Sequence, residues 1–227
     1  MERFEVIQKI IDKISAKAYL EIGVEYGTVF MRIKAREKIA VDPELKISGK
    51  KKLVNLIDIF KNKYFSITSD EFFSRYNNLF PDKKIDVAFV DGLHTHSQSL
   101  KDIENCLKYL DKKGIIIVHD CSPQNEFSAA PVRKISEQAG EKKWNGDVWK
   151  AIVQLRSTRP DLQIFTLDCD YGLGIIRKGQ PESMLDYSSE QIKEMAYEDL
   201  AQNRQKFLNL RNVDYFEEFL AVLGIKK

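Results

Sequence analysis

The stretch that decides the fold reads YLEIGVEYG at positions 19–27. A short apolar run at Ala18–Ile22 leads into two glycines, Gly23 and Gly27. Residues without a Cβ allow the backbone to approach a ligand closely. We therefore predict a β-strand that is followed by a ligand-binding turn.

Short apolar runs alternate with helical patterns through the first 180 residues. This alternation predicts an α/β fold of the Rossmann-like kind, with a mostly parallel seven-stranded sheet and flanking helices. Helical periodicity occurs at positions 4–14, 97–110 and 147–156. The last two strands lie close enough in sequence for a C-terminal antiparallel hairpin. The predicted strands are Ala18–Ile22, Lys38–Val41, Tyr64–Thr68, Asp86–Val90, Gly114–His119, Leu162–Leu167 and Gly172–Arg177.

Strand signals stop after Lys178, and the rest of the chain is predicted to be helical at Ser188–Leu210 and Val213–Leu223. We expect one domain at residues 1–180, which includes the N-terminal helix. A helical appendage at residues 181–227 would pack on that domain or serve in a homodimer.

Charge and composition exclude several classes of protein. The 227 residues carry 36 basic and 34 acidic side chains, and this near-balance gives no large field to hold nucleic acid. The longest aliphatic run, Ile115–Val118, falls far short of the ~20 apolar residues of a membrane-spanning helix. The N-terminus lacks the layout of a secretion signal. Three cysteines without a C-x-x-C pair indicate neither disulfides nor a thiolate zinc site, so we expect a cytoplasmic protein.

Acidic residues follow five of the predicted strands, where ligands bind in open parallel sheets. Solvated loop acids explain any one of them, but the same loops also hold all three histidines of the chain, His94, His96 and His119. We therefore predict the functional site at this edge of the sheet. The acids are Glu21 with Glu25, then Asp42, Asp70, Asp91 and Asp120.

The first of these loops indicates the class of cofactor. Glu25 occupies the middle glycine position of the dinucleotide pattern G-x-G-x-x-G, where a carboxylate would repel a pyrophosphate. Asp42 lies 19 positions after Gly23 and can accept both hydroxyls of a ribose. Glu21 adds an anion that suits an ammonium or sulfonium group. S-adenosylmethionine satisfies these conditions, whereas a nicotinamide dinucleotide, the alternative, is disfavoured by Glu25.

The cofactor site is predicted from the loops that follow the first four strands. Adenine is expected near Ser69 and Asp70, the ribose on Asp42, and the amino-acid end near Gly23 and Glu21. The full set of predicted cofactor-binding residues is Glu21, Gly23, Tyr26, Gly27, Asp42, Ser69, Asp70, Asp91, Gly92 and His94.

Four ordered motifs, YLEIG at 19–23, VDP at 41–43, VDGLH at 90–94 and VHD at 118–120, resemble class I S-adenosylmethionine-dependent methyltransferases over about residues 18–178. With NGDVWK at 145–150, the chain is similar to bacterial small-molecule O-methyltransferases, many of them associated with sugars. The resemblance implies methyl transfer to a hydroxyl of a small molecule or glycan precursor. A binding protein that keeps the fold without turnover remains the alternative.

Two routes for removing the acceptor proton stay open, with His94, Asp91 and Asp120 as the catalytic candidates. In the first route His94 takes the proton, because an imidazole titrates near neutral pH. In the second, Asp91 and Asp120 hold Mg²⁺ or another divalent ion, which lowers the pKa of the hydroxyl. Metal-dependent O-methyltransferases commonly have Asn directly after the second Asp, whereas this chain has Cys121.

The long polar segment Gln124–Asn145 is predicted to act as a lid over the acceptor. Trp144 or Trp149, with Asp147, is expected to help form the acceptor pocket, although Trp149 is better explained as core. A cysteine hydrolase built on Cys121 is a further alternative, but its neighbours do not form the tight nucleophile elbow.

Overall fold

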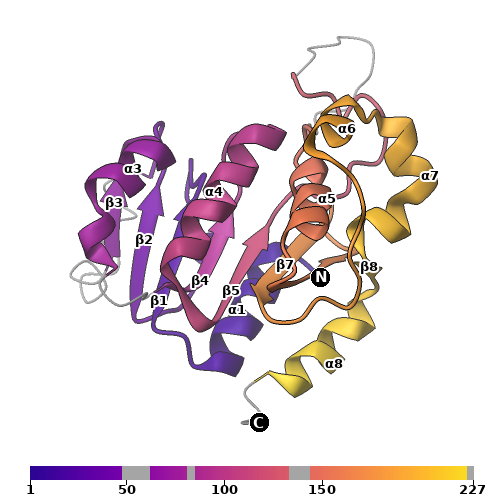
Figure 1. The fold of residues 1–227 in the computed structure, drawn as a ribbon. Coiled ribbons are helices and arrows are strands. Elements are labelled where there is room, and N and C mark those ends of the chain that lie inside the picture. The colour runs from indigo at the N-terminus through magenta and orange to yellow at the C-terminus, as the bar shows by residue number, and fades with distance from the viewer. Residues whose placement is uncertain (48–61, 81–84, 133–143, 224–227) are drawn as a thin grey trace.

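The computed structural model describes residues 1–47, 62–80, 85–132 and 144–223, in which one β-sheet lies between two layers of helices (Figure 1). The strand order is β3-β2-β1-β4-β5-β7-β6-β8. Neighbours are parallel from β3 to β5, β7 is antiparallel to both β5 and β6, and β8 is parallel to β6. The strands are β1 Ala18–Ile22, β2 Glu37–Val41, β3 Asn62–Phe65, β4 Ile85–Val90, β5 Leu110–Val118, β6 Leu162–Leu167, β7 Leu173–Lys178 and β8 Leu210–Arg211.

The predicted α/β fold and the predicted antiparallel hairpin of β6 and β7 are confirmed. The sheet has eight strands in its described part, not seven, because Leu210–Arg211 pairs with the outer edge of β6. Two residues are too few to show strand periodicity in the sequence. Pairing with them covers an edge that β6 would otherwise expose.

The two helical layers bury the two faces of the sheet. The β-branched run Ile115–Val118 of β5 is fully buried because it packs alternately against both layers. Helices α1 (Arg3–Ile14) and α8 (Val213–Val222) cover one face. The other face is covered by α3 (Ser69–Arg75), α4 (His96–Tyr109), α5 (Trp149–Thr158), α6 (Ser189–Glu194) and α7 (Tyr197–Leu208), with a short 3₁₀ helix at Asn77–Leu79.

The C-terminal segment packs on the rest of the chain through apolar and polar contacts. The single helix predicted at 188–210 is instead α6 and α7, because Met195 leaves the helical conformation with ψ 139°. Phe207 and Leu208 are buried in the core beside α5. Arg204 donates hydrogen bonds to Ser122 Oγ at 2.7 Å and to the Pro123 carbonyl at 2.8 Å. The homodimer stays a prediction.

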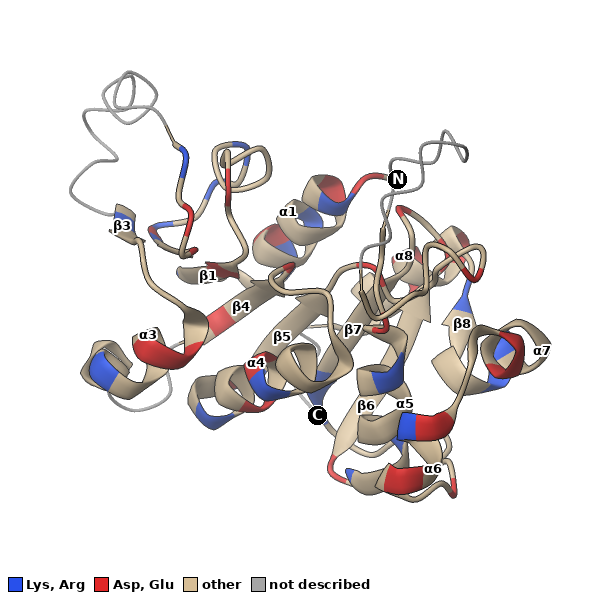
Figure 2. Cartoon of the chain, turned by 90° about the horizontal axis from the view of Figure 1, so that it is seen from above, with Lys and Arg blue, Asp and Glu red and all other residues tan. Residues whose placement is uncertain are grey.

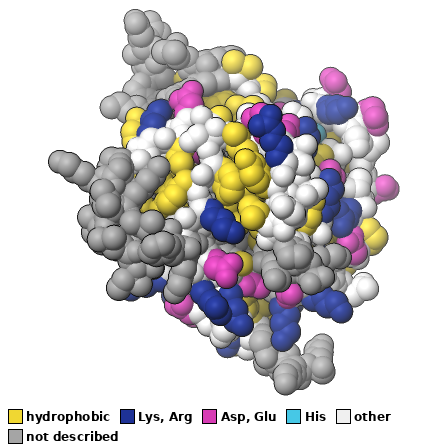
Figure 3. All heavy atoms as spheres, turned by 90° about the vertical axis from the view of Figure 1, so that its left-hand side faces the viewer, with side chains coloured by type: hydrophobic (Ala, Val, Ile, Leu, Met, Phe, Trp, Pro, Cys, Tyr) yellow, Lys and Arg dark blue, Asp and Glu magenta, His cyan; other side chains and the backbone are white. Residues whose placement is uncertain are grey.

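Acidic and basic residues are interspersed along the helices (Figure 2). Hydrophobic side chains also reach the surface at the side where β3 lies, between charged ones (Figure 3). No helix in the described ranges is long and apolar enough to cross a bilayer.

Candidate active site

Two adjoining cavities lie at the carboxyl ends of the parallel strands, as the sequence predicts. The large cavity, of about 710 Å³, lies over the ends of β1, β2 and β4. The small cavity, of about 420 Å³, lies beside it toward β5. Leu93 and His94 line both, so the loop that follows β4 separates the two spaces.

The turn after β1 requires a glycine at its first position. Gly23 has φ +85°, and a Cβ there would lie only 2.0 Å from the carbonyl oxygen of Asp91. The two strand ends therefore meet closely at the floor of the large cavity. Gly27 also has a positive φ, of +70°, but it packs against Ile47 and does not line the cavity.

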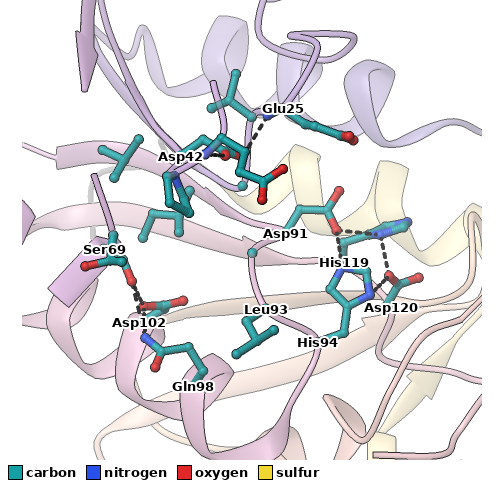
Figure 4. Close-up of a pocket in the computed structure, with 18 of the residues that line it drawn as sticks. Glu25, Asp42, Ser69, Asp91, Leu93, His94, Gln98, Asp102, His119 and Asp120 are labelled. Carbon is teal, nitrogen blue, oxygen red and sulfur yellow. Dashed lines mark hydrogen bonds and ion pairs between the residues drawn. The ribbon is translucent and has the colours of Figure 1, made fainter. Parts of the chain in front are cut away.

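Asp42, at the end of β2, is held by backbone amides. Its Oδ2 accepts the Glu25 N–H at 2.8 Å, and its Oδ1 accepts the Glu44 N–H at 2.7 Å. A carboxylate has about four lone-pair sites, so both oxygens keep capacity for ribose hydroxyls. The side chain lies in the lining of the large cavity (Figure 4). Tyr26 and Ser69, also predicted, lie in the same lining.

Glu21 differs from its prediction, since it is 1% exposed and lies outside the lining of the large cavity. Alternation along β1 points Glu21 to the same face as Tyr19, which donates a hydrogen bond to it at 2.5 Å. Burial raises the pKa of Glu21 to about 8. Its carboxyl group therefore belongs to the core on the α1 side and is not placed to meet a sulfonium.

An acid–histidine cluster, made of Asp91, His94, His119 and Asp120, joins the ends of β4 and β5 (Figure 4). His119 Nδ1 lies 3.0 Å from Asp91 Oδ1 and 3.2 Å from Asp120 Oδ2. His94 Nδ1 lies 3.1 Å from Asp120 Oδ2, and His94 Nε2 lies 3.4 Å from Asp91 Oδ1. The structure thus brings together all three residues that the sequence nominated for catalysis.

The charges in this cluster stabilise one another. Burial favours the neutral form of Asp91, but the charge and hydrogen bond of His119 hold the pKa of Asp91 well below its usual range. Burial lowers the pKa of His119, yet Asp91, Asp120 and Asp170 together raise it well above 6.5. The pKa of His94 is raised as well, because its interactions with the two acids outweigh its burial.

The NGD segment, Asn145 to Asp147, holds the loop that carries His94 in place through close packing and hydrogen bonds. Gly146 has φ +66°, and a Cβ there would lie 1.7 Å from the carbonyl oxygen of His94. Asn145 Nδ2 donates to Asp120 Oδ1 at 2.5 Å, and Asp147 Oδ1 accepts the backbone N–H of His96 at 2.6 Å. Asp147 therefore positions the loop. The prediction that it helps to form the acceptor pocket is wrong, because it does not line the small cavity.

Arg3 and Asp170 are site residues that the sequence did not reveal. Arg3 Nε donates to Asp170 Oδ2 at 2.8 Å, and its Nη1 donates to Asp91 Oδ2 at 3.1 Å. Both residues line the small cavity, and Arg3 also lines the large one. Arg3 begins a helix whose apolar stripe dominates its pattern, so no local signal marks this residue as functional.

Trp144 and Trp149 have different roles. Trp144 stacks on His94, with ring centroids 5.3 Å apart, and lines the small cavity. Trp149 is 1% exposed and stacks on Phe207, so its interpretation as core is confirmed. The predicted lid, Gln124–Asn145, lies partly outside the described residues, at 133–143.

A divalent ion is a second use that the donor atoms of the cluster allow. Asp91, His94 and Asp120 each offer one ligand atom, and these atoms lie within 4.8 Å of one another. Carboxylate oxygens and an imidazole nitrogen are accepted ligands. However, Asp91 is already paired with the Arg3 guanidinium, and an ion would also have to displace protons from the histidines. The donor atoms are of the type that binds a divalent ion, but the Arg3 guanidinium and the histidine protons already offset the charge of the acids.

Cys121 does not have the properties of a nucleophile. It is fully buried, and burial raises the pKa of its thiol far above the usual value. A reactive cysteine needs a depressed pKa and access to substrate. The cysteine-hydrolase alternative therefore lacks its thiolate.

Comparisons with known proteins show which class of domain this fold resembles. Residues 20–121 match a family model described as a methyltransferase domain. No curated protein matches the chain. Together with the fold, the family match confirms the predicted resemblance to class I S-adenosylmethionine-dependent methyltransferases.

Solved structures share the fold at low sequence identity. An O-methyltransferase from Bacillus cereus, in complex with S-adenosylhomocysteine, is 13% identical with a TM-score of 0.52, covering 78% of this chain and 80% of that one. The S-adenosylhomocysteine-bound methyltransferase PaMTH1 of Podospora anserina is 18% identical with a TM-score of 0.52, at 79% and 80% coverage. The O-methyltransferase TomG of Streptomyces achromogenes, in complex with S-adenosylmethionine, is 10% identical with a TM-score of 0.56, at 78% and 79% coverage.

Proposed function

We propose that this chain transfers the methyl group of S-adenosylmethionine to a hydroxyl of a small, polyol-like acceptor. The observation that carries the proposal is the pair of adjoining cavities that meet at His94. The large cavity holds the donor, with its ribose on Asp42. The small cavity holds the acceptor beside the group that removes its proton. Two of the solved structures that share the fold carry S-adenosylhomocysteine, the product of such a transfer.

His94 is the proposed base. Its Nδ1 faces the Asp120 carboxylate at 3.1 Å and the Trp144 carbonyl at 3.1 Å, so the proton of a neutral imidazole resides on Nδ1. Its Nε2 has only the longer contact of 3.4 Å to Asp91, which leaves a lone pair for the acceptor proton. Holding the hydroxyl near the methyl group and weakening its O–H bond supply the catalysis, because the sulfonium is already activated.

The lining of the small cavity suits a hydroxyl-rich acceptor. Asn145 is 2% exposed, and its Oδ1 has no hydrogen-bond partner among the described residues. A buried amide oxygen without a donor costs free energy, which an acceptor hydroxyl would recover. The indole of Trp144 offers an apolar face, and Asp170 offers a carboxylate. This mixture favours a sugar or another polyol over a flat apolar acceptor.

The charge balance favours the base route over the metal route. Asp91, Asp120 and Asp170 carry three negative charges, and Arg3 with a protonated His119 offsets two of them, so His94 can be neutral and act as the base. A divalent ion on Asp91, His94 and Asp120 would lie close to the Arg3 guanidinium, which already pairs with Asp91, so the two cations would repel each other. If such an ion binds, Asp91, His94 and Asp120 are its ligands, and it would supply Lewis-acid polarisation of the hydroxyl.

Calorimetry with S-adenosylhomocysteine tests the donor site. We expect Asp42→Asn to weaken binding by about 1.5–3 kcal/mol for each charge-assisted hydrogen bond lost. The matched control is Asp86→Asn, at the opposite end of the sheet, because Asp86 also accepts two backbone N–H groups, from Lys17 and Ala18. Equal affinities of the Asp42 variant and the wild type would remove the proposed donor site.

A methyl-transfer assay with a panel of sugars and polyols, run with and without a chelator, tests the chemistry. We expect turnover in the presence of chelator and its loss in His94→Ala. Loss of turnover with chelator, restored by Mg²⁺, would instead assign the cluster to a metal ion.

A further inference from the structure

Asp102 is a buried carboxyl group in the wall of the large cavity. It has no role in the methyl transfer proposed above. It lies on α4, is 1% exposed and lines the cavity together with Ser69 and Gln98. In Figure 4, Asp102 and Ser69 lie at one end of the cavity, whereas His94 and Asp120 lie at the other. A nucleoside whose reactive end meets His94 would therefore place its base beside Asp102.

The two oxygens of Asp102 differ in their partners. Oδ1 accepts hydrogen bonds from Ser69 Oγ at 2.6 Å and from Gln98 Nε2 at 3.0 Å. Oδ2 accepts none from the part of the chain that the structure describes. It lies over Gly92, since a Cβ on Gly92 would be 3.5 Å from it. Oδ1 is thus anchored, and Oδ2 is left for a ligand.

We infer that Asp102 determines specificity for adenine in the methyl donor, by accepting a hydrogen from the exocyclic amino group on Oδ2. The inference rests on the proposed function and adds a residue that recognises the adenine of the donor. A keto group at the same position of the purine can only accept, so a carboxylate would repel it. Asp102 therefore favours the binding of adenine over that of its deaminated counterpart, hypoxanthine.

The environment of Asp102 supports this assignment over Asp70, the acid predicted for the adenine end. Asp70 is paired at 2.6 Å with Lys101 on the surface. Burial raises the pKa of Asp102 to about 6, although Ser69 and Gln98 oppose the shift. A buried carboxylate with one unpaired oxygen is costly, and a bound N–H donor offsets that cost.

Calorimetry with two ligands tests the inference. S-adenosylhomocysteine carries the amino group, and S-inosylhomocysteine carries a keto group in its place. We expect the wild type to bind the amino compound at least about tenfold more tightly, the effect of one hydrogen bond to a charged group. In Asp102→Asn, Oδ1 keeps its two donors while the new amide N–H₂ favours a keto group. The preference should therefore vanish or reverse.

Glu104→Gln is the matched control, because it removes one acidic charge from an exposed site on the same helix. It should keep the preference of the wild type. Equal affinity of the wild type for the two ligands overturns the inference without any variant, as does an unchanged preference in Asp102→Asn. Failure of the wild type to bind either ligand would count against the proposed donor site instead.

Discussion

Arg3 Nη1 lies 3.1 Å from Asp91 Oδ2, so the first turn of α1 is tied directly to the end of β4. The same guanidinium pairs with Asp170, in the turn between β6 and β7. Three segments that are far apart in sequence therefore meet at one side chain, whose exposed fraction is only 26%.

Replacing Arg3 with alanine should lower the free energy of unfolding by about 1–3 kcal/mol, because two partly buried acids, Asp91 and Asp170, lose a charged donor. Urea denaturation measures this change. Lys9→Ala, which breaks the exposed pair between Lys9 and Glu217, is the control and should cost less than about 1 kcal/mol. Equal effects of the two variants would mean that Arg3 is only a surface charge.

Gly146→Ala should damage both stability and turnover. The position has φ +66°, and a Cβ would collide with the carbonyl of His94, so the loop that carries the proposed base must shift. We expect a loss of about 1–3 kcal/mol in thermal unfolding, together with a lower kcat. A variant as stable and as active as the wild type would show that this contact is not required.

Glu21 should make the stability fall as pH rises. Its pKa is about 8 in the folded chain, against 4.5 as the ordinary value, so between these limits the folded state holds a proton that the unfolded state has lost. Stability should decrease with pH in this window by on the order of 1 kcal/mol per unit. Glu21→Gln should flatten the slope in urea denaturation from pH 5 to 8. The same slope in both proteins would contradict the buried, neutral carboxyl.

The rate of methyl transfer should rise with pH through the pKa of His94, which lies above 6.5, because the base must be neutral. Asp120→Asn removes one of the charges that raise this pKa, so the rising limb of kcat/KM should move to lower pH. A pH–rate profile of both proteins measures the shift. An unmoved limb would exclude coupling between His94 and Asp120.

Trp144→Ala should raise the KM for the acceptor by about tenfold, since one aromatic face of the small cavity is lost. The affinity for S-adenosylhomocysteine should not change, because Trp144 does not line the large cavity. Trp144→Phe, which keeps a ring, should restore part of the acceptor affinity. An unchanged acceptor KM in Trp144→Ala would place the acceptor elsewhere.

The sequence by itself determined the alternation of strands and helices and the chemical character of the strand ends. Both are local properties: apolar runs form strands, and the residues directly after a parallel strand must lie at the ligand-binding edge. Asp42, Asp91, His94 and Asp120 could be nominated for this reason. The donor class was inferred from Glu25, whose charge disfavours a pyrophosphate, from Asp42, which can accept both hydroxyls of a ribose, and from the charge of Glu21.

Only the tertiary structure decided which side chains meet. Glu21 and Asp91 both sit at strand ends, yet alternation along β1 buries the first in the core. Arg3, Asp102, Asn145 and Asp170 come from helices, turns and loops that no periodicity links to the strand ends. Such contacts depend on how helices pack across the sheet, and that packing depends on the fit of the whole core.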